Sequence, residues 1–186
     1  LKSFIKELPK NDPFQEVAKE IPLITKLIDT GYTGRKGKGG FYRMNKTDNK
    51  KILEAINLET EEYSSTKKID LGIDTVNLNL LISRKDKYGE YAWSVISKII
   101  KYASSLVPGI TDKFNDIDEA MRLGFNWAMG PFEMLKSLGV KNFFERIDSF
   151  ENNKFLEKLN QNKDENFYGE RQKYTNIETL GKVKPK

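Results

Sequence analysis

Residues 116–134 read DIDEAMRLGFNWAMGPFEM, and this stretch decides the fold. The pattern predicts a helix that stops at Gly124, a tight apolar turn, and a second helix that begins at Pro131. Two helices joined in this way are typical of a helical core rather than a sheet. At the turn, Gly130 leaves backbone N–H groups that can face a carbonyl or a phosphate, while Glu133 competes for the same positive helix end.

Helical patterns flank this stretch on both sides. The clearest is Tyr88–Leu106, whose apolar stripe is broad enough to be buried against more than one neighbour. Further helices are expected at 21–29, 70–83, 115–123, 131–138, 142–150 and 154–159, whereas residues 1–20 are a poor candidate for long regular structure. Two runs, Phe41–Asn45 and Lys51–Leu58, predict a small β-hairpin, with a short third strand at Tyr63. The sequence therefore predicts a mainly α fold with a small β-hairpin.

Two residue types are absent, and their absence narrows the chemistry. The 186 residues include no cysteine and no histidine. Disulfides, thiolate metal sites, Ser–His–Asp triads, HExxH zinc sites and zinc fingers are therefore excluded. Carboxylates, lysines and tyrosines remain as bases, and no Asp-rich calcium loop is present. The residues themselves predict no catalytic group and no metal ligand.

Charge and apolar runs set the broad class of the chain. Lys and Arg number 32 and Asp and Glu 27, so the net charge is +5, which aids solubility and is a weak sign of nucleic-acid binding. The longest apolar run, Tyr91–Val107, is interrupted by Lys98 and Lys101, so neither a membrane span nor a secretory signal is predicted. We expect a cytoplasmic chain of one compact domain or two small ones. Its start at Leu1 rather than Met is expected of a piece of a longer protein.

The glycine-lysine loop Gly31–Gly40 resembles a phosphate-binding loop only superficially. Five residues, rather than the four of a P-loop, separate Gly31 from Gly37, and a glycine follows Lys38. A dinucleotide turn is disfavoured because Tyr42 occupies the position of the third glycine. Two interpretations remain: a helix exit that leads into a strand, and a loop that binds an anionic group through Arg35, Lys36 and Lys38. The structural interpretation is the stronger one.

Several residues elsewhere have ordinary structural explanations. Asp116 and Asp118 are expected to be helix-start residues rather than an acid–base pair, because neighbours in sequence do not face each other on a helix. Trp93 and Trp127 are expected in the core. The segment after Gln161 is expected to be a polar tail that contains Phe167-Tyr168.

Two motifs, in a fixed order, resemble the helical C-terminal domains of 3-hydroxyacyl-CoA dehydrogenases. Residues 34–42 read GRKGKGGFY, which is similar to the GRKxGxGFY segment that ends the first of these domains. Residues 116–133 are similar to the pattern DIDxAMxxGFxxxxGPFE of a second copy. Residues 51–63 and 166–169 also resemble long bacterial members of the family, which continue into an enoyl-CoA hydratase module.

The resemblance implies a fold, an activity and partners. It implies four segments: the end of a first helical domain (1–45), a β-hairpin linker (46–70), a second helical domain (71–160) and a polar tail (161–186). The implied reaction is the oxidation of a 3-hydroxyacyl-CoA by NAD⁺. The family's Rossmann domain and catalytic His precede the region seen here, so no catalytic residue carries over and no cofactor is expected on this chain.

The chain would then be a helical scaffold beside the substrate cleft, inactive by itself. Its expected partners are the Rossmann NAD-binding domain, an enoyl-CoA hydratase module and a second copy of the chain. Candidate interface residues lie at the central turn: Phe125, Trp127, Met129, Gly130, Pro131 and Phe132. Arg35, Lys36 and Lys38 are candidate contacts for an anion or for CoA. Two alternatives stay open: a basic module that binds RNA or another polyanion through Gly31–Gly40, and a stand-alone interaction protein.

Overall fold

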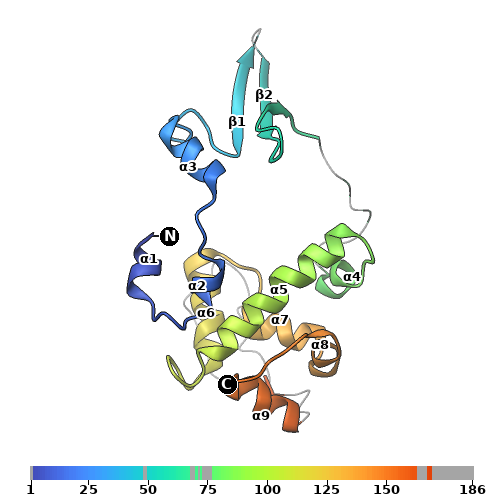
Figure 1. Ribbon diagram of the computed structural model, residues 1–186. Helices are drawn as coiled ribbons and strands as arrows, with labels where there is room; N and C mark the ends of the chain where they lie inside the picture. The colour runs from blue at the N-terminus through green and yellow to red at the C-terminus, as the bar shows by residue number, and fades with distance from the viewer. Residues whose placement is uncertain are drawn as a thin grey trace. The chain divides into compact units, whose positions relative to one another are not determined.

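The computed structural model describes residues 2–47, 50–67, 70, 72, 77–162 and 167–168. The chain divides into two compact units, residues 1–70 and residues 71–186, and each is described by itself. The fold is mainly helical with one small three-stranded antiparallel sheet, which confirms the predicted fold class (Figure 1).

The first unit combines short helices with the sheet. Its helices are α1 (Lys2–Glu7), α2 (Phe14–Val17) and α3 (Pro22–Asp29), and its strands are β1 (Tyr42–Thr47), β2 (Lys50–Ile56) and β3 (Tyr63–Ser65). Pro22 begins α3, where its missing N–H costs no hydrogen bond. Gly31 has φ 85°, a conformation that glycine adopts without strain, and it ends the helix as predicted.

The sheet follows the predicted hairpin with longer strands. Antiparallel pairing places Met44 opposite Leu53 and Ile56 opposite Tyr63, so the third strand at Tyr63 is confirmed. The first strand extends to Thr47 instead of ending at Asn45, because the ladder of backbone hydrogen bonds continues through polar side chains that periodicity does not detect. Residues 48 and 49, within the expected connection between the two strands, lie outside the described residues.

One face of the sheet carries a polar and aromatic network. Arg43 Nε donates to a Glu54 carboxylate oxygen at 2.6 Å, and Asn45 Nδ2 donates to the other at 2.9 Å. These hydrogen bonds, that from Asn45 first, lower the pKa of Glu54. The Arg43 guanidinium lies 4.0 Å from the centre of the Tyr63 ring, which stacks on Tyr32 at 5.5 Å. Through Tyr32, the network fixes the start of the Gly31–Gly40 loop to the sheet.

The second unit is a set of packed helices. They are α4 (Leu78–Ile82), α5 (Lys87–Ser105), α6 (Phe114–Phe125), α7 (Pro131–Leu138), α8 (Val140–Arg146) and α9 (Lys154–Asn162). The longest, α5, packs against α4, α7 and α9, as its broad apolar stripe predicts (Figure 1). Within the described residues, every helix is too short or too polar to cross a lipid bilayer.

The long helix α5 has a charged start. Asp86 accepts hydrogen bonds from the N–H groups of Tyr88 and Gly89, both at 3.1 Å, and so caps the helix. Arg84 forms an ion pair with Asp86, and this contact together with the cap lowers the pKa of Asp86 to about 2. A side chain at position 89 would meet the Arg84 carbonyl oxygen at 2.2 Å, so the helix start requires glycine there.

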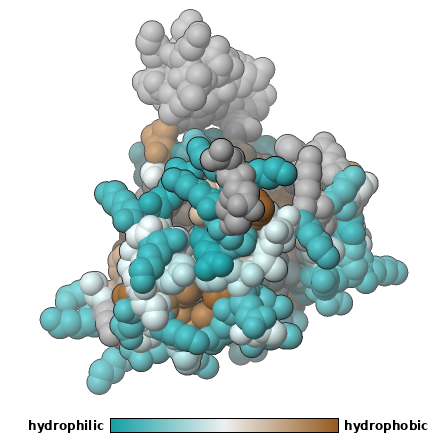
Figure 2. Space-filling model, turned by 90° about the horizontal axis from the view of Figure 1, so that it is seen from above, coloured by the Kyte–Doolittle hydropathy of each residue, from teal (hydrophilic) through white to brown (hydrophobic). Residues whose placement is uncertain are grey.

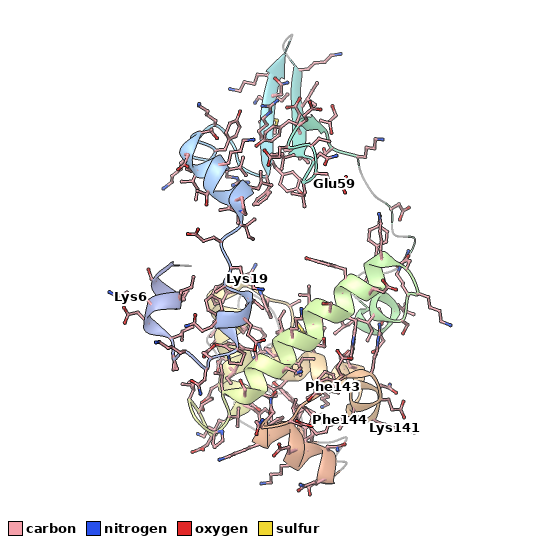
Figure 3. All side chains as sticks on the ribbon, in the orientation of Figure 1. Lys6, Lys19, Glu59, Lys141, Phe143 and Phe144 are labelled. Carbon is pink, nitrogen blue, oxygen red and sulfur yellow. The ribbon has the colours of Figure 1, made fainter. Side chains whose placement is uncertain are left out.

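The core of this unit has two adjoining parts. The first joins α4, α5, α7, α8 and α9 around Ile100, Leu135 and Phe143. Figure 3 labels Phe143 and Phe144, the two α8 side chains that pack there among the other helices. The second is an aromatic cluster around Phe132, which is fully buried.

On the face in Figure 2, hydrophilic residues cover most of the surface and hydrophobic ones emerge only in small areas between them.

Several predicted boundaries in this unit are corrected. Helix α6 continues through Gly124 to Phe125, because Asn126 takes the left-handed conformation (φ 56°) that ends it. Helix α8 spans 140–146 rather than 142–150, since Gly139 (φ 82°) separates it from α7. The predicted helix 70–83 is shortened to α4, because Asn77 caps its start and the described residues 70 and 72 are not helical. Residues 71 and 73–76 lie outside the described residues.

The segment expected to be a polar tail enters the core at one point. Phe167 and Tyr168 pack against Phe114, with ring centres 5.7 and 5.6 Å away. Tyr168 is 8% exposed. Burying two aromatic rings contributes a large favourable free energy, which outweighs the polar character of the surrounding residues. The polar composition of the segment therefore predicted a tail where the chain enters the core. Residues 163–166 and 169–186, with the expected terminal disorder, lie outside the described residues.

Candidate functional site

The turn between α6 and α7 is organised by a buried carboxylate. Asp118, on α6, is 0% exposed. Its two oxygens accept the backbone N–H groups of Phe132 at 2.9 Å and of Glu133 at 3.0 Å. Asp118 is therefore a helix cap supplied from another helix, since it satisfies the first N–H groups of α7 across 14 and 15 residues of sequence.

A second carboxylate completes this helix start. Glu133 is 7% exposed, and it accepts the N–H of Gly130 at 2.9 Å and a hydrogen bond from Arg122 at 2.6 Å. The Arg122 side chain is 15% exposed, so the pair is largely screened from water. The free helix start predicted at Gly130 does not exist, because Asp118 and Glu133 occupy the N–H groups that an anion would need.

Tyr168 closes the cluster from the end of the described chain. Its hydroxyl donates a hydrogen bond to Asp118. Burial raises the pKa of Asp118, and its hydrogen bonds oppose that effect only in part. Burial, followed by the hydrogen bond to Asp118, raises the pKa of Tyr168. We call Asp118, Arg122, Gly130, Glu133 and Tyr168 the Asp118 cluster.

The Asp118 cluster has no access for a substrate. Its two carboxylates are buried, and their oxygens already accept hydrogen bonds from the helix start. Gly130 lies so close that a Cβ there would be 2.3 Å from a carboxylate oxygen of Asp118. General acid–base chemistry needs a group within reach of the substrate's proton, so this cluster is suited to holding α6 and α7 together.

The candidate interface residues separate into exposed and buried groups. Phe125 is 71% exposed at the end of α6. Trp127 is half-buried, and Met129 packs in part against the core. Gly130, Pro131 and Phe132 are buried within the unit. Phe125 is thus the side chain of this set that a partner can reach most fully.

The Gly31–Gly40 loop has the helix-to-strand geometry of the structural interpretation. Gly34 and Gly39 pair through a 2.6 Å hydrogen bond, with φ values of 103° and 135°. The loop is fastened to the sheet where the Tyr63 hydroxyl donates to the Gly40 carbonyl at 2.5 Å. The glycines at 34 and 39 are required by their positive φ.

The three basic residues of this loop have different surroundings. The Lys38 ammonium donates to the Thr30 carbonyl at 3.0 Å, at the negative end of α3, so it has a structural role. Arg35 and Lys36 are exposed. Arg35 borders an open depression of about 490 Å³ between α3 and the start of β1, with Ile24, Ile28 and Phe41 among its other lining residues.

The sequence of residues 92–169 matches the family described as the C-terminal domain of 3-hydroxyacyl-CoA dehydrogenase. This segment therefore belongs to that family of C-terminal domains. The match includes both α6 and α7 and reaches past Tyr168, so the whole Asp118 cluster lies inside the family segment.

Curated relatives agree with this assignment. The chain is 41% identical over 133 residues to a putative fatty acid oxidation complex trifunctional enzyme of Rickettsia felis, over 72% of the chain and 18% of the relative. The Rickettsia prowazekii protein of the same name is 39% identical over 145 residues, 78% of the chain and 20% of the relative. A probable 3-hydroxyacyl-CoA dehydrogenase of Bacillus subtilis is 29% identical over 142 residues, 72% of the chain and 18% of the relative. The chain spans about a fifth of the length of these relatives. No solved structure matches it significantly.

The family implies NAD for the complete enzyme, and the described residues do not fit that cofactor. A dinucleotide site needs a parallel sheet with a glycine-rich turn from a strand into a helix. The sheet of this chain is antiparallel, and its glycine-rich loop leads from a helix into a strand. Among the described residues, no three acidic side chains gather closely enough to hold a metal ion.

Sequence reasoning identified the segment but not its central residue. Asp118 was expected to be a helix-start residue of its own helix, whereas it caps the next one. Glu133, three residues after Gly130, is at the spacing of a capping box and was the detectable signal. Nothing in the local pattern indicates that Tyr168, 50 residues beyond Asp118, contacts it, because that contact depends on the packing of α9.

Proposed function

We propose that this chain forms the C-terminal helical part of an NAD-dependent 3-hydroxyacyl-CoA dehydrogenase of fatty acid oxidation, where it is a scaffold beside the substrate cleft. The observation that carries the proposal is the structural role of the buried carboxylates in residues 92–169. These carboxylates, Asp118 and Glu133, join two helices and face no open site. A segment built in this way supplies shape and contacts rather than reacting groups.

The proposed reaction places the chemistry on another part of the enzyme. Oxidation of a 3-hydroxyacyl-CoA requires a base for the hydroxyl proton and an acceptor for the hydride. This chain has no histidine, and its described residues offer no dinucleotide site. Loss of a general base alone slows a reaction by roughly 10²- to 10⁴-fold. We expect the chain alone to be inactive.

The proposed partners follow from the same context. A Rossmann NAD-binding domain is the main one, with an enoyl-CoA hydratase module and a second copy of the chain as further candidates, all in the cytoplasm. Phe125 is the proposed contact residue, since an aromatic side chain with 71% exposure gains free energy when a partner covers it. Arg35 and Lys36 are proposed contacts for an anionic group such as that of CoA.

Reconstitution tests the proposal. The purified chain is mixed with the separately produced NAD-binding domain of a trifunctional relative, and NADH formation from 3-hydroxybutyryl-CoA is followed by absorbance. We expect no NADH from the chain alone and a rate with the mixture above that of the NAD-binding domain alone. Phe125→Ser should reduce the gain, whereas Ile110→Ser, at a side chain 77% exposed before the start of α6, should leave it unchanged. Activity of the unmixed chain, or a mixture no faster than the domain alone, contradicts the proposal.

The alternative is a module that binds a polyanion through Gly31–Gly40. It is favoured by the exposure of Arg35 and Lys36 on a loop with net positive charge. Binding of RNA should then weaken steeply between low and physiological salt. Arg35→Ala should reduce the slope, and an absence of binding at low salt removes this alternative.

A further inference from the structure

The first unit has almost no core of its own. Among the described residues of 1–70, the one large hydrophobic side chain that is buried is Leu27. Apolar side chains that normally enter a core are instead exposed, including Ile28 (56%), Phe41 (43%) and Tyr42 (62%). Exposure on this scale in a unit of 70 residues indicates a surface that another molecule covers.

The exposed apolar residues form one continuous strip. It begins in the open depression between α3 and β1, where Ile28 and Tyr42 lie among the lining residues. It continues along the sheet, because Tyr42 and Met44 alternate onto one side of β1 and Leu53 is directly opposite Met44. Met44 is 52% exposed and Leu53 is 44% exposed. We call these residues, with Phe41, the α3–hairpin strip.

Basic residues stand at both ends of the α3–hairpin strip. Arg35 and Lys36 lie at the end that contains the depression, and Lys46 and Lys51 form an opposed pair on the sheet at the other end. Residues 31–56 contain seven basic and two acidic residues, a net charge of +5. A partner must therefore be apolar in the middle and acidic at its ends.

The shape and the charge distribution of the strip decide which class of partner fits it. A lipid surface is flat and cannot fill a depression of about 490 Å³, whereas the side chains along one face of a helix can. A nucleic acid needs cations along its path, and here the middle is apolar. A second copy would bring like charges together at both ends of a two-fold interface. A helix with an apolar stripe and acidic ends satisfies each requirement.

We propose that the α3–hairpin strip is a docking groove for an amphipathic, acidic-ended helix of a partner polypeptide. This inference rests on the scaffold role proposed above and adds the face that docks and the charge of what it receives. The Asp118 cluster plays no part in it, because that cluster lies in the other unit.

Designed peptides test the docking groove on the full chain. The probe is a fluorescent helical peptide of about 18 residues with a leucine stripe and glutamates at both ends, and its partner peptide differs only in having lysines there. Fluorescence anisotropy measures affinity, and hydrogen exchange maps the protected residues. We expect saturable binding of the glutamate peptide, at least about tenfold weaker binding of the lysine peptide, and protection of α3 and β1.

Variants separate the groove from general charge attraction. Arg35→Glu with Lys36→Glu should weaken binding about tenfold, while Lys98→Glu with Lys158→Glu, an equal charge change on the second unit, should stay within about twofold. Met44→Asp, at an exposed position that the fold does not need, should also weaken it. Equal affinities for both peptides, no binding, protection elsewhere, or binding to anionic vesicles or to a second copy in preference to the peptide would overturn the inference. None of these measurements uses dehydrogenase activity, so a failed reconstitution with intact peptide binding counts against the proposed function alone.

Discussion

The glycine at position 130 offers a sharp test of how the Asp118 cluster holds α6 to α7. Gly130 has φ −79° and ψ 171°, which an alanine adopts freely, so backbone strain does not explain the glycine. The explanation is contact. A Cβ at this position would lie 2.3 Å from a carboxylate oxygen of Asp118 and 2.4 Å from its Cα and Cβ atoms.

These contacts set the magnitude of the effect. Carbon atoms pack at about 3.5 Å or more, so Gly130→Ala requires α6 and α7 to separate by about 1 Å. The Asp118 backbone is part of a helix and cannot rotate away as a side chain tip does. Overpacking of this kind costs about 1–3 kcal/mol, and we expect the upper end, about 3 kcal/mol, because the shift also lengthens the hydrogen bonds to Phe132 and Glu133. For a unit of this size the midpoint temperature should fall by about 12 °C.

Gly124→Ala is the matched control, six residues earlier in the same motif. Gly124 lies inside α6, with no atom within 4 Å of a Cβ added there. Alanine should therefore raise stability by about 0.5–1 kcal/mol, since it is the better helix former. The free energy of unfolding is measured with urea by tryptophan fluorescence, which reports on the second unit because Trp93 and Trp127 are the chain's two tryptophans. A Gly130→Ala variant as stable as the natural chain, or a Gly124→Ala variant that is the less stable of the two, refutes this account of the turn.

Three further variants probe the buried carboxylate and the start of α5. Asp118→Ala leaves two helix N–H groups and a tyrosine hydroxyl without their acceptor, and should lower the free energy of unfolding by about 3 kcal/mol in the same urea assay; a loss below about 1 kcal/mol contradicts the capping role. Tyr168→Phe removes one of those hydrogen bonds and should cost about 1 kcal/mol, with hydrogen exchange at the start of α7 as a local measure. Asp86 has a folded-state pKa of about 2, below its ordinary value, so its contribution to stability is present above about pH 4 and is lost as the pH falls towards 2. Asp86→Ala should flatten the pH dependence of stability in that window, and an unchanged slope between pH 4 and 2 would show that the carboxylate is not responsible.

The sequence by itself determined the helical class, the position of most helices and the family. Glycine, proline and apolar spacing act within a few residues, so α3 and α7 begin and end almost where the pattern places them. The small sheet followed in the same way, because alternation along β1 and β2 is a local signal as well. The structural interpretation of the Gly31–Gly40 loop also depended on local conformation, since glycine is what positive φ requires.

Only the tertiary structure decided how the residues of the 116–134 motif contact one another. Whether Asp118 starts its own helix or caps another one depends on the distance between α6 and α7, which no local pattern encodes. The same holds for Tyr168, whose burial depends on the aromatic side chains of α6, α7 and α9 meeting at one place. Contacts between residues far apart in sequence exist only once the helices have packed, and so the buried cluster and the exposed strip emerge from the fold rather than from the order of residues.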